Sequence, residues 1–219
     1  MIIAIDGPSA SGKSTLGRLL ARALNLLYID TGSMYRAVAL AVMEADIDPS
    51  DKEAVAAIAN EIDIDLKGDP DSLKVWLNGR DVTDQIRTES VTETSSIVSS
   101  IPGVRRAMVE RQRAMGKRGA VLNGRDIGTV VFPDADFKFF LTANPNERAE
   151  RRYKEDQVTS DSTLAETLSD INERDRRDST RADSPLKAAD DAVIVDSTGK
   201  SIEQVLAEMM NHIDVHRNH

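Results

Sequence analysis

The sequence predicts an α/β fold with a five-stranded parallel sheet flanked by helices, formed as a single domain over residues 1–219. Short apolar runs typical of buried strands occupy residues 2–6, 26–30, 120–123, 137–141 and 192–196. Helical patterns alternate with these runs, and a glycine-rich turn follows the first of them directly. Such alternation favours a parallel sheet covered by helices on both faces.

The helices expected beside the first and last strands are amphipathic. Residues 15–24 place four leucines on one helical face, at positions 16, 19, 20 and 24. Near the C-terminus Ile202, Val205, Leu206 and Met209 recur at the same spacing. Both segments therefore have an apolar side with which to cover the sheet.

A further helix is expected after the fourth strand. Asn144 is a good N-cap, Pro145 suits the first helical position and Glu147 the third. This helix opens a strongly charged region, from Glu147 to about Arg181, that contains seven arginines, at 148, 151, 152, 174, 176, 177 and 181. A charged run of this kind is usually only a solvated face, so a function needs other support.

The gap between the second and third strands, roughly residues 44 to 119, is far longer than a simple crossover needs. Residues 73–77 and 81–82 flank Asn78-Gly79, a dipeptide that suits a tight hairpin turn. Residues 62–66 alternate with period two and are a candidate third strand. A small antiparallel sheet is therefore expected as an insertion.

Composition excludes several classes of protein. The 37 acidic and 28 basic residues give a net charge of -9, which argues against a nucleic-acid partner. The chain has no cysteine, so disulfides and thiolate metal sites are excluded, and the three histidines near the C-terminus receive no role. The apolar stretch 1–5 is too short to span or target a membrane. We expect a cytoplasmic protein. We also expect a monomer, because no apolar surface stripe stands out as a dimer interface.

The glycine-rich turn has the pattern G-x-x-x-x-G-K-[S/T] in the context that the pattern requires, after a strand and before a helix. Glycines permit close backbone approach, and the N–H groups and helix dipole point at an anion. Lys13 is expected to reach the β- and γ-phosphates of ATP, Ser14 to ligate Mg²⁺, and the Thr15 N–H to meet the α-phosphate. The candidate ATP-binding residues are Gly7, Pro8, Ser9, Ala10, Ser11, Gly12, Lys13, Ser14 and Thr15.

A phosphate-binding loop alone does not separate kinases from GTPases and motor ATPases. The guanine-reading pattern N-K-x-D is absent, which disfavours a switch protein. A kinase needs cations to neutralise two phosphate groups and must exclude water. Four arginines could converge on the cleft above the sheet: Arg36, Arg125, Arg174 and Arg181.

The sequence closely resembles bacterial cytidylate kinases, a family of nucleoside monophosphate kinases with a P-loop kinase fold. The resemblance spans almost the whole chain and rests on GPSASGKST (7–15), DTGSMYRA (30–37), DVTDQIRTESV (81–91), NGRDIGTVVFPDA (123–135), ERDRRDSTRADSPL (173–186) and DSTGKSIEQV (196–205). It implies a monophosphate-binding insertion over about residues 44–100 and a helical lid over about 148–165. One departure is Ala10, where family members often carry glycine.

The resemblance also implies substrate-binding residues. Arg36 and Arg125 match contacts to the acceptor phosphate, and Arg174 and Asp178 match contacts to the ribose. The family residues that read the cytosine edge correspond to Ser96, Arg105 and Asp126. Arg181 matches an arginine near the transferred phosphoryl group, and Thr31 lies beside Tyr35 in the turn that forms the pocket.

Plainer interpretations of some of these residues remain open. Asp126 could instead form an ion pair with a nearby arginine, and Ser96 could be a neutral hydroxyl in a serine-rich helix. Arg36 and Arg105 could be solvated or could pack against the inserted sheet.

The expected reaction is transfer of the γ-phosphoryl group of Mg-ATP to CMP or dCMP, with Lys13, Arg125 and Arg181 as the catalytic residues. Asp126 would accept from the exocyclic amino group of cytosine, which favours cytosine over uracil. The alternatives are a P-loop kinase for another small acceptor, such as UMP, AMP or shikimate, and a non-catalytic nucleotide-binding switch.

Overall fold

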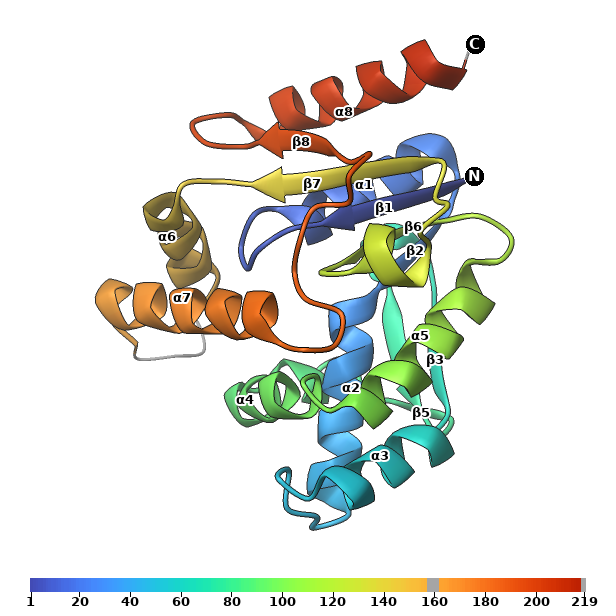
Figure 1. Cartoon of the computed structure of the whole chain (residues 1–219), viewed down its shortest axis with the longest axis vertical. Coiled ribbons are helices and arrows are strands. Elements are labelled where there is room, and N and C mark those ends of the chain that lie inside the picture. The colour runs from blue at the N-terminus through green and yellow to red at the C-terminus, as the bar shows by residue number, and fades with distance from the viewer. Residues whose placement is uncertain (157–161, 218–219) are drawn as a thin grey trace.

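The computed structural model describes residues 1–156 and 162–217 (Figure 1). Its larger sheet has the order β2-β6-β1-β7-β8, and every neighbouring pair of strands is parallel. The strands are β1 (Ile2–Asp6), β2 (Leu27–Asp30), β6 (Ala120–Gly124), β7 (Phe137–Thr142) and β8 (Val193–Asp196). The predicted five-stranded parallel sheet is confirmed, with each strand end within one residue of its predicted position.

Alternate side chains of the strands enter two separate cores. Ile3 and Ile5 of β1 face the helices α1 (Lys13–Leu24) and α8 (Ile202–Arg217), whereas Ala4 faces the opposite side. That opposite side is covered by α2 (Thr31–Glu44) and α5 (Pro102–Gly116). The period of two along each strand thus produces the two-sided cover that the alternation of elements predicted.

A three-stranded antiparallel sheet forms within the long insertion, in the order β3-β4-β5. It comprises β3 (Ile64–Lys67), β4 (Lys74–Leu77) and β5 (Arg80–Asp81). Asn78 and Gly79 both have positive φ, 50° and 77°, and the Asn78 carboxamide accepts from the Asp63 N–H at 2.8 Å. The predicted hairpin turn is confirmed, because these two residues tolerate the left-handed backbone that such a turn requires.

Helices connect this small sheet to the larger one. α3 (Lys52–Glu61) precedes it, and α4 (Glu89–Val98) follows it after a short turn at Gln85–Arg87; another short turn, Pro70–Ser72, joins β3 to β4. Buried residues of the insertion such as Val75 and Val98 belong to the same core as Ala4 of the central strand. Figure 1 shows the insertion gathered around α2, below the large sheet. The boundaries 44–100 stay a prediction.

Two helices lie beyond the carboxyl end of β7, α6 (Pro145–Asp156) and α7 (Leu164–Thr180) (Figure 1). The Asn144 carboxamide accepts from the Asn146 N–H at 2.9 Å, so α6 starts where the sequence predicts. Glu147 accepts from the Gly199 N–H at 3.0 Å, so its carboxylate links α6 to the loop before α8. The predicted lid, 148–165, includes residues 157–161, which lie outside the described residues, and it stays a prediction.

Across residues 1–156 and 162–217, no helix combines the length and the apolar character that a membrane span requires.

Candidate active site

Most predicted site residues gather at the carboxyl edge of the larger sheet. The glycine-rich loop follows β1, Thr31 follows β2, and Arg125 and Asp126 follow β6. Helix α7, later in the chain, adds Arg174 and Asp178. The carboxyl ends of parallel strands face one crevice, which is the usual ligand site in an open α/β sheet.

Close packing explains why the loop begins with glycine. A Cβ on Gly7, whose φ is 147°, would lie 2.1 Å from the Leu141 carbonyl oxygen. Gly12 caps α1 with φ 95°, also in the left-handed region. Ala10 occupies that region too, with φ 55°, at the position where the family often has glycine. The loop therefore lies against β7 and delivers the first turn of α1, with its free N–H groups, into the crevice.

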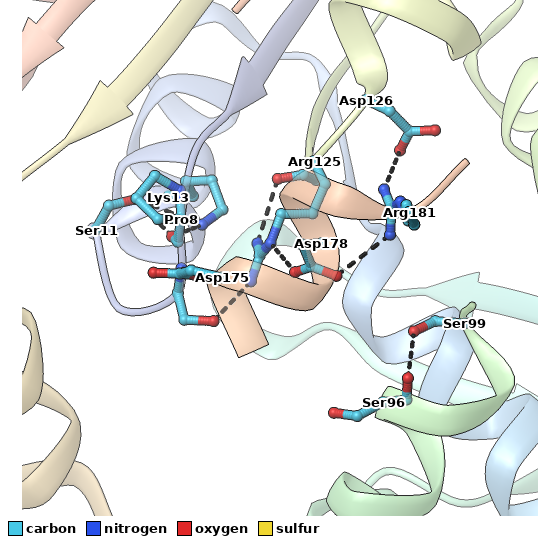
Figure 2. Close-up of polar contacts among 12 residues, drawn as sticks. Pro8, Ser11, Lys13, Ser96, Ser99, Arg125, Asp126, Asp175, Asp178 and Arg181 are labelled. Carbon is cyan, nitrogen blue, oxygen red and sulfur yellow. Dashed lines mark hydrogen bonds and ion pairs between the residues drawn. The ribbon is translucent and has the colours of Figure 1, made fainter. Parts of the chain in front are cut away.

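Lys13 and Ser14 begin α1 inside this loop. Lys13 is 6% exposed, and its ammonium donates to the Pro8 carbonyl oxygen at 2.5 Å and to the Ser11 hydroxyl at 3.4 Å (Figure 2). Burial, and next the charge of Arg125, lower the pKa of Lys13. The Ser14 hydroxyl accepts from the Asn123 amide at 3.2 Å. A buried cation and a hydroxyl thus stand together at a helix N-terminus.

Two arginines share one carboxylate on the other side of the loop. Arg125 donates to Asp178 at 2.9 Å and to the Ser9 hydroxyl at 2.9 Å, and Arg181 donates to Asp178 at 3.3 Å. Figure 2 shows Asp178 between the two guanidinium groups. Burial alone would raise the pKa of Asp178, but the charges of Arg125, Arg181 and Arg174 hold it below its ordinary value. Asp178 therefore remains ionised and fixes both arginines.

Positive charge is concentrated around Arg174. Burial, followed by repulsion from Arg125, lowers the pKa of Arg174 to about 10, and Arg36 and Arg152 act in the same direction. Arg36 also donates to the Ile86 carbonyl oxygen at 3.3 Å. An otherwise acidic protein thus gathers cations at one point, which suits a polyanionic ligand.

Asp126 and Arg105 form a buried ion pair. Their side chains are 6% and 3% exposed, and the guanidinium nitrogen lies 2.5 Å from the carboxylate. Arg105 also donates to the Ser99 carbonyl oxygen at 3.1 Å and lies 5.4 Å above the Tyr35 ring. Arg181 is 4.0 Å from the other Asp126 oxygen. The structure therefore contains the ion pair that the sequence analysis offered as the alternative role of Asp126. The partner of Asp126 in this pair, Arg105, is itself a predicted base-reading residue.

Two buried nitrogens of these arginines remain available. Among the described residues, Nε of Arg105 and an Nη of Arg181 have no hydrogen-bond partner. Buried donors normally have acceptors, so this pair can receive acceptor atoms of a ligand.

Thr31 and Ser96 differ in how closely they join the site. The Thr31 hydroxyl donates to the Asn123 carbonyl oxygen at 2.8 Å and so ties the start of α2 to β6. Ser96 donates to the Thr92 carbonyl oxygen at 3.4 Å within α4, and Figure 2 shows it apart from the cluster of Arg125, Asp178 and Arg181. Its role stays a prediction.

Sequence reasoning missed several residues that support the site. Asn123 donates to Ser14, and Arg148 and Asp175 form an ion pair at 2.5 Å beside Ser9. Arg148 and Asp175 lie in the charged region, and Asn123 and Asp175 lie in two of the segments that resemble the family, but neither signal assigned them a role. Their partners are more than a hundred residues away, at distances along the chain that no local pattern encodes.

Asp6 is a further missed residue, buried at the end of β1. Its carboxylate accepts from the N–H groups of Ile127 and Gly128, each at 2.8 Å, and so fixes the turn that carries Arg125 and Asp126. Burial raises the pKa of Asp6 from 3.8 to about 6. The charge of Asp126 also raises this pKa, whereas the hydrogen bonds from Gly128 and Ile127 and the charge of Lys13 lower it.

This raised pKa predicts a pH effect on stability. Because folded Asp6 binds its proton more tightly than unfolded Asp6, its contribution to the free energy of unfolding should increase as pH falls from about 7 to about 4. A rise of about two units corresponds to roughly 3 kcal/mol at most. Urea unfolding of the wild type and of Asp6→Asn at several pH values measures the difference. A difference that does not change with pH would contradict the assignment.

Comparison with known proteins gives a consistent result. The family model for cytidylate kinase matches residues 3–215. The cytidylate kinase of Geobacter sp. (strain M21) is 49% identical over 211 residues, covering 95% of this chain and 91% of that protein. The cytidylate kinase of Halalkalibacterium halodurans is 45% identical over 215 residues and covers 97% of each chain.

Solved structures agree on the fold. An uncharacterized protein from Eubacterium ventriosum superposes with a TM-score of 0.56 at 12% identity, covering 98% of each chain. Shikimate kinase from Bacteroides thetaiotaomicron gives a TM-score of 0.51 at 13% identity, again covering 98% of each chain. With the family model spanning nearly the whole sequence, the chain belongs to the cytidylate kinase family.

Proposed function

We propose that this protein transfers the γ-phosphoryl group of ATP to a phosphate oxygen of CMP or dCMP, giving ADP and CDP or dCDP. The observation that supports this most directly is that the phosphate-binding loop and a cluster of arginines lie side by side. A phosphate-binding loop with a buried Lys13 lies beside an arginine cluster, and Arg125 contacts both Ser9 of the loop and Asp178 of the cluster.

The charges suit in-line transfer between two phosphate groups. The acceptor phosphate is already anionic, so positioning and charge stabilisation suffice without a strong general base. Lys13 and the first N–H groups of α1 would hold the donor phosphates. Arg36 and Arg125 would hold the acceptor phosphate, and Arg181 would stabilise charge on the transferred group.

The residues around Ser14 fit a nucleotide-bound Mg²⁺. The hydroxyl is an oxygen ligand, and Asp30 lies close by, because both accept from the Asn123 amide. Among the described residues no three His, Cys, Asp or Glu side chains gather as a metal cage. Mg²⁺ on a nucleotide needs only one or two protein oxygens beside phosphate and water. When bound, the ion neutralises charge on the β- and γ-phosphates.

Cytosine recognition would involve the buried pair of Arg105 and Asp126. The pair holds the carboxylate in place, while the free Nε of Arg105 can donate to cytosine N3 or O2. Asp126 can accept from the exocyclic amino group, which uracil lacks. Arg174 and Asp178 would contact the ribose, Ser96 the base edge, and Thr31 the pocket wall.

A panel of acceptors tests the proposal. Purified protein with ATP and Mg²⁺ is given CMP, dCMP, UMP, AMP and shikimate in parallel, and ADP release is followed together with the phosphorylated product. CMP and dCMP should be consumed at much the highest kcat/KM. Brisk turnover of another acceptor with none of CMP would overturn the proposal in favour of a different small-acceptor kinase.

A further inference from the structure

Ser9, in the first half of the phosphate-binding loop, is fastened to the two C-terminal helices. Its N–H donates to Asp175 of α7 at 2.9 Å, and its carbonyl oxygen accepts from Arg148 of α6 at 2.9 Å. Arg148 also pairs with the second carboxylate oxygen of Asp175 at 2.5 Å. We name Arg148 and Asp175 the Ser9 clamp; it engages both backbone polar groups of a single loop residue.

The clamp is well shielded from solvent. The side chains of Arg148 and Asp175 are 7% and 16% exposed, and Ser9 is 8% exposed. The third polar group of Ser9, its hydroxyl, accepts from Arg125, which binds Asp178 one turn along α7 from Asp175. Helix α7 therefore contacts the loop directly through Asp175 and indirectly through Arg125.

The loop needs such outside support. Ala10, next to Ser9, has φ 55°, which costs a non-glycine residue about 1 kcal/mol. The hydrogen bonds that Arg148 and Asp175 make to Ser9 prevent this strained backbone from relaxing. The later N–H groups, from Gly12 onward, keep their direction only while the earlier part of the loop is fixed.

A carboxylate beside a phosphate-binding loop would by its charge alone weaken anion binding. Asp175 lies near enough to Lys13 to raise its pKa, against the stronger lowering by burial and by Arg125. Arg148 compensates the charge of Asp175, and both oxygens of Asp175 are used in hydrogen bonds. The Asp175 carboxylate is thus placed to hold the loop backbone at Ser9.

We propose that Asp175 is a positioning residue for the phosphoryl donor: with Arg148 it holds Ser9, and through Ser9 it orients the N–H groups that bind the ATP phosphates. The inference rests on the proposed function and extends it to a residue that touches no substrate.

Two substitutions at one position separate geometry from charge. Asp175→Ala removes both the acceptor for Ser9 and the negative charge, whereas Asp175→Asn removes the charge but keeps an acceptor oxygen. Asp170→Ala, on the exposed side of the same helix, is the matched control for charge. Calorimetry gives the Kd for Mg-ATP, and steady-state kinetics give the KM for ATP and for CMP, well below each variant's unfolding temperature.

Asp175→Ala should weaken ATP binding about tenfold, as expected for loss of a charge-assisted hydrogen bond. The KM for CMP should change by about twofold or less, which marks an effect on one substrate. The affinity of Asp175→Asn for ATP should lie between those of Asp175→Ala and the wild type, and the affinity of Asp170→Ala should equal that of the wild type.

Three results would overturn the inference. Tighter ATP binding by both Asp175 variants would show that charge repulsion outweighs positioning. Equal increases in KM for ATP and CMP would indicate a general structural role, as would unchanged ATP binding with lowered thermal stability. If the wild type binds ATP but makes no CDP, the proposed function fails, while the comparison of ATP affinities still decides the role of Asp175.

Discussion

Replacement of Lys13 by Met is expected to abolish ATP turnover and leave the protein folded. The ammonium is the buried cation of the phosphate-binding loop and lies within a helix N-terminus. Loss of one preorganised charge-stabilising group from a site of this kind lowers kcat by about a hundred- to a thousandfold. Under the proposed function Lys13 would hold the phosphates at the transferred group, so we expect a loss at the upper end of that range or beyond it.

The fold should survive because Met matches the length of Lys without a charge to desolvate. Burial lowers the pKa of Lys13, which means that the folded state holds the charged form at a cost in stability. The unfolding temperature of Lys13→Met should therefore equal or exceed that of the wild type. Lys117→Met, on an exposed lysine, controls for loss of a positive charge. Retained ATP turnover in a folded Lys13→Met protein would remove this lysine from catalysis.

Replacement of Asp126 by Ala is expected to cause the largest loss of stability. The substitution leaves the guanidinium of Arg105 buried without its carboxylate, with Arg181 as a second cation nearby. Breaking a buried ion pair from one side costs about 3–5 kcal/mol, a large part of a domain's total stability. Urea unfolding measures the change. A loss below about 1 kcal/mol would show that the pair is well solvated.

Asp126→Asn is the better variant for testing base selectivity, because it keeps the size of the side chain. One Asp126 oxygen accepts from Arg105 at 2.5 Å, so the amide oxygen of Asn should take that position and its NH₂ the other. That NH₂ can donate to uracil O4 but repels the amino group of cytosine. The ratio of kcat/KM for CMP to that for UMP should therefore fall by about tenfold or more.

Arg105→Lys is a useful companion to this variant. It retains a positive charge beside Asp126 but removes the fork of donors, so it loosens the carboxylate without leaving it unpaired. Selectivity for CMP should fall less than in Asp126→Asn. Unchanged base selectivity in Asp126→Asn would reject the assignment of Asp126 as a base-reading residue.

Local patterns were sufficient for the strands and for the phosphate-binding loop. A buried parallel strand is a short apolar run, and the loop is a contiguous motif whose glycines at 7 and 12 have backbone conformations set by neighbouring atoms. The hairpin turn at Asn78-Gly79 and the helix start at Asn144 were predictable for the same reason. In each case the sequence pattern that permits the prediction lies within a few residues, although the contact that requires glycine at position 7 comes from the distant Leu141.

Predictions were weaker where residues meet across the chain. The sequence placed Asp126 and Arg105 in the site only through family resemblance, and it left open whether Asp126 forms an ion pair. It gave no indication that Asp6 holds the turn after β6, or that the remote Arg148 and Asp175 hold Ser9.

The sequence by itself therefore determined the strands, several of the helices, the phosphate-binding loop and the family. The tertiary structure alone decided which charges face one another and how much water reaches them. The physical reason is that periodicity and capping depend on near neighbours, whereas an ion pair depends on where the folded sheet brings distant strand ends and helices together.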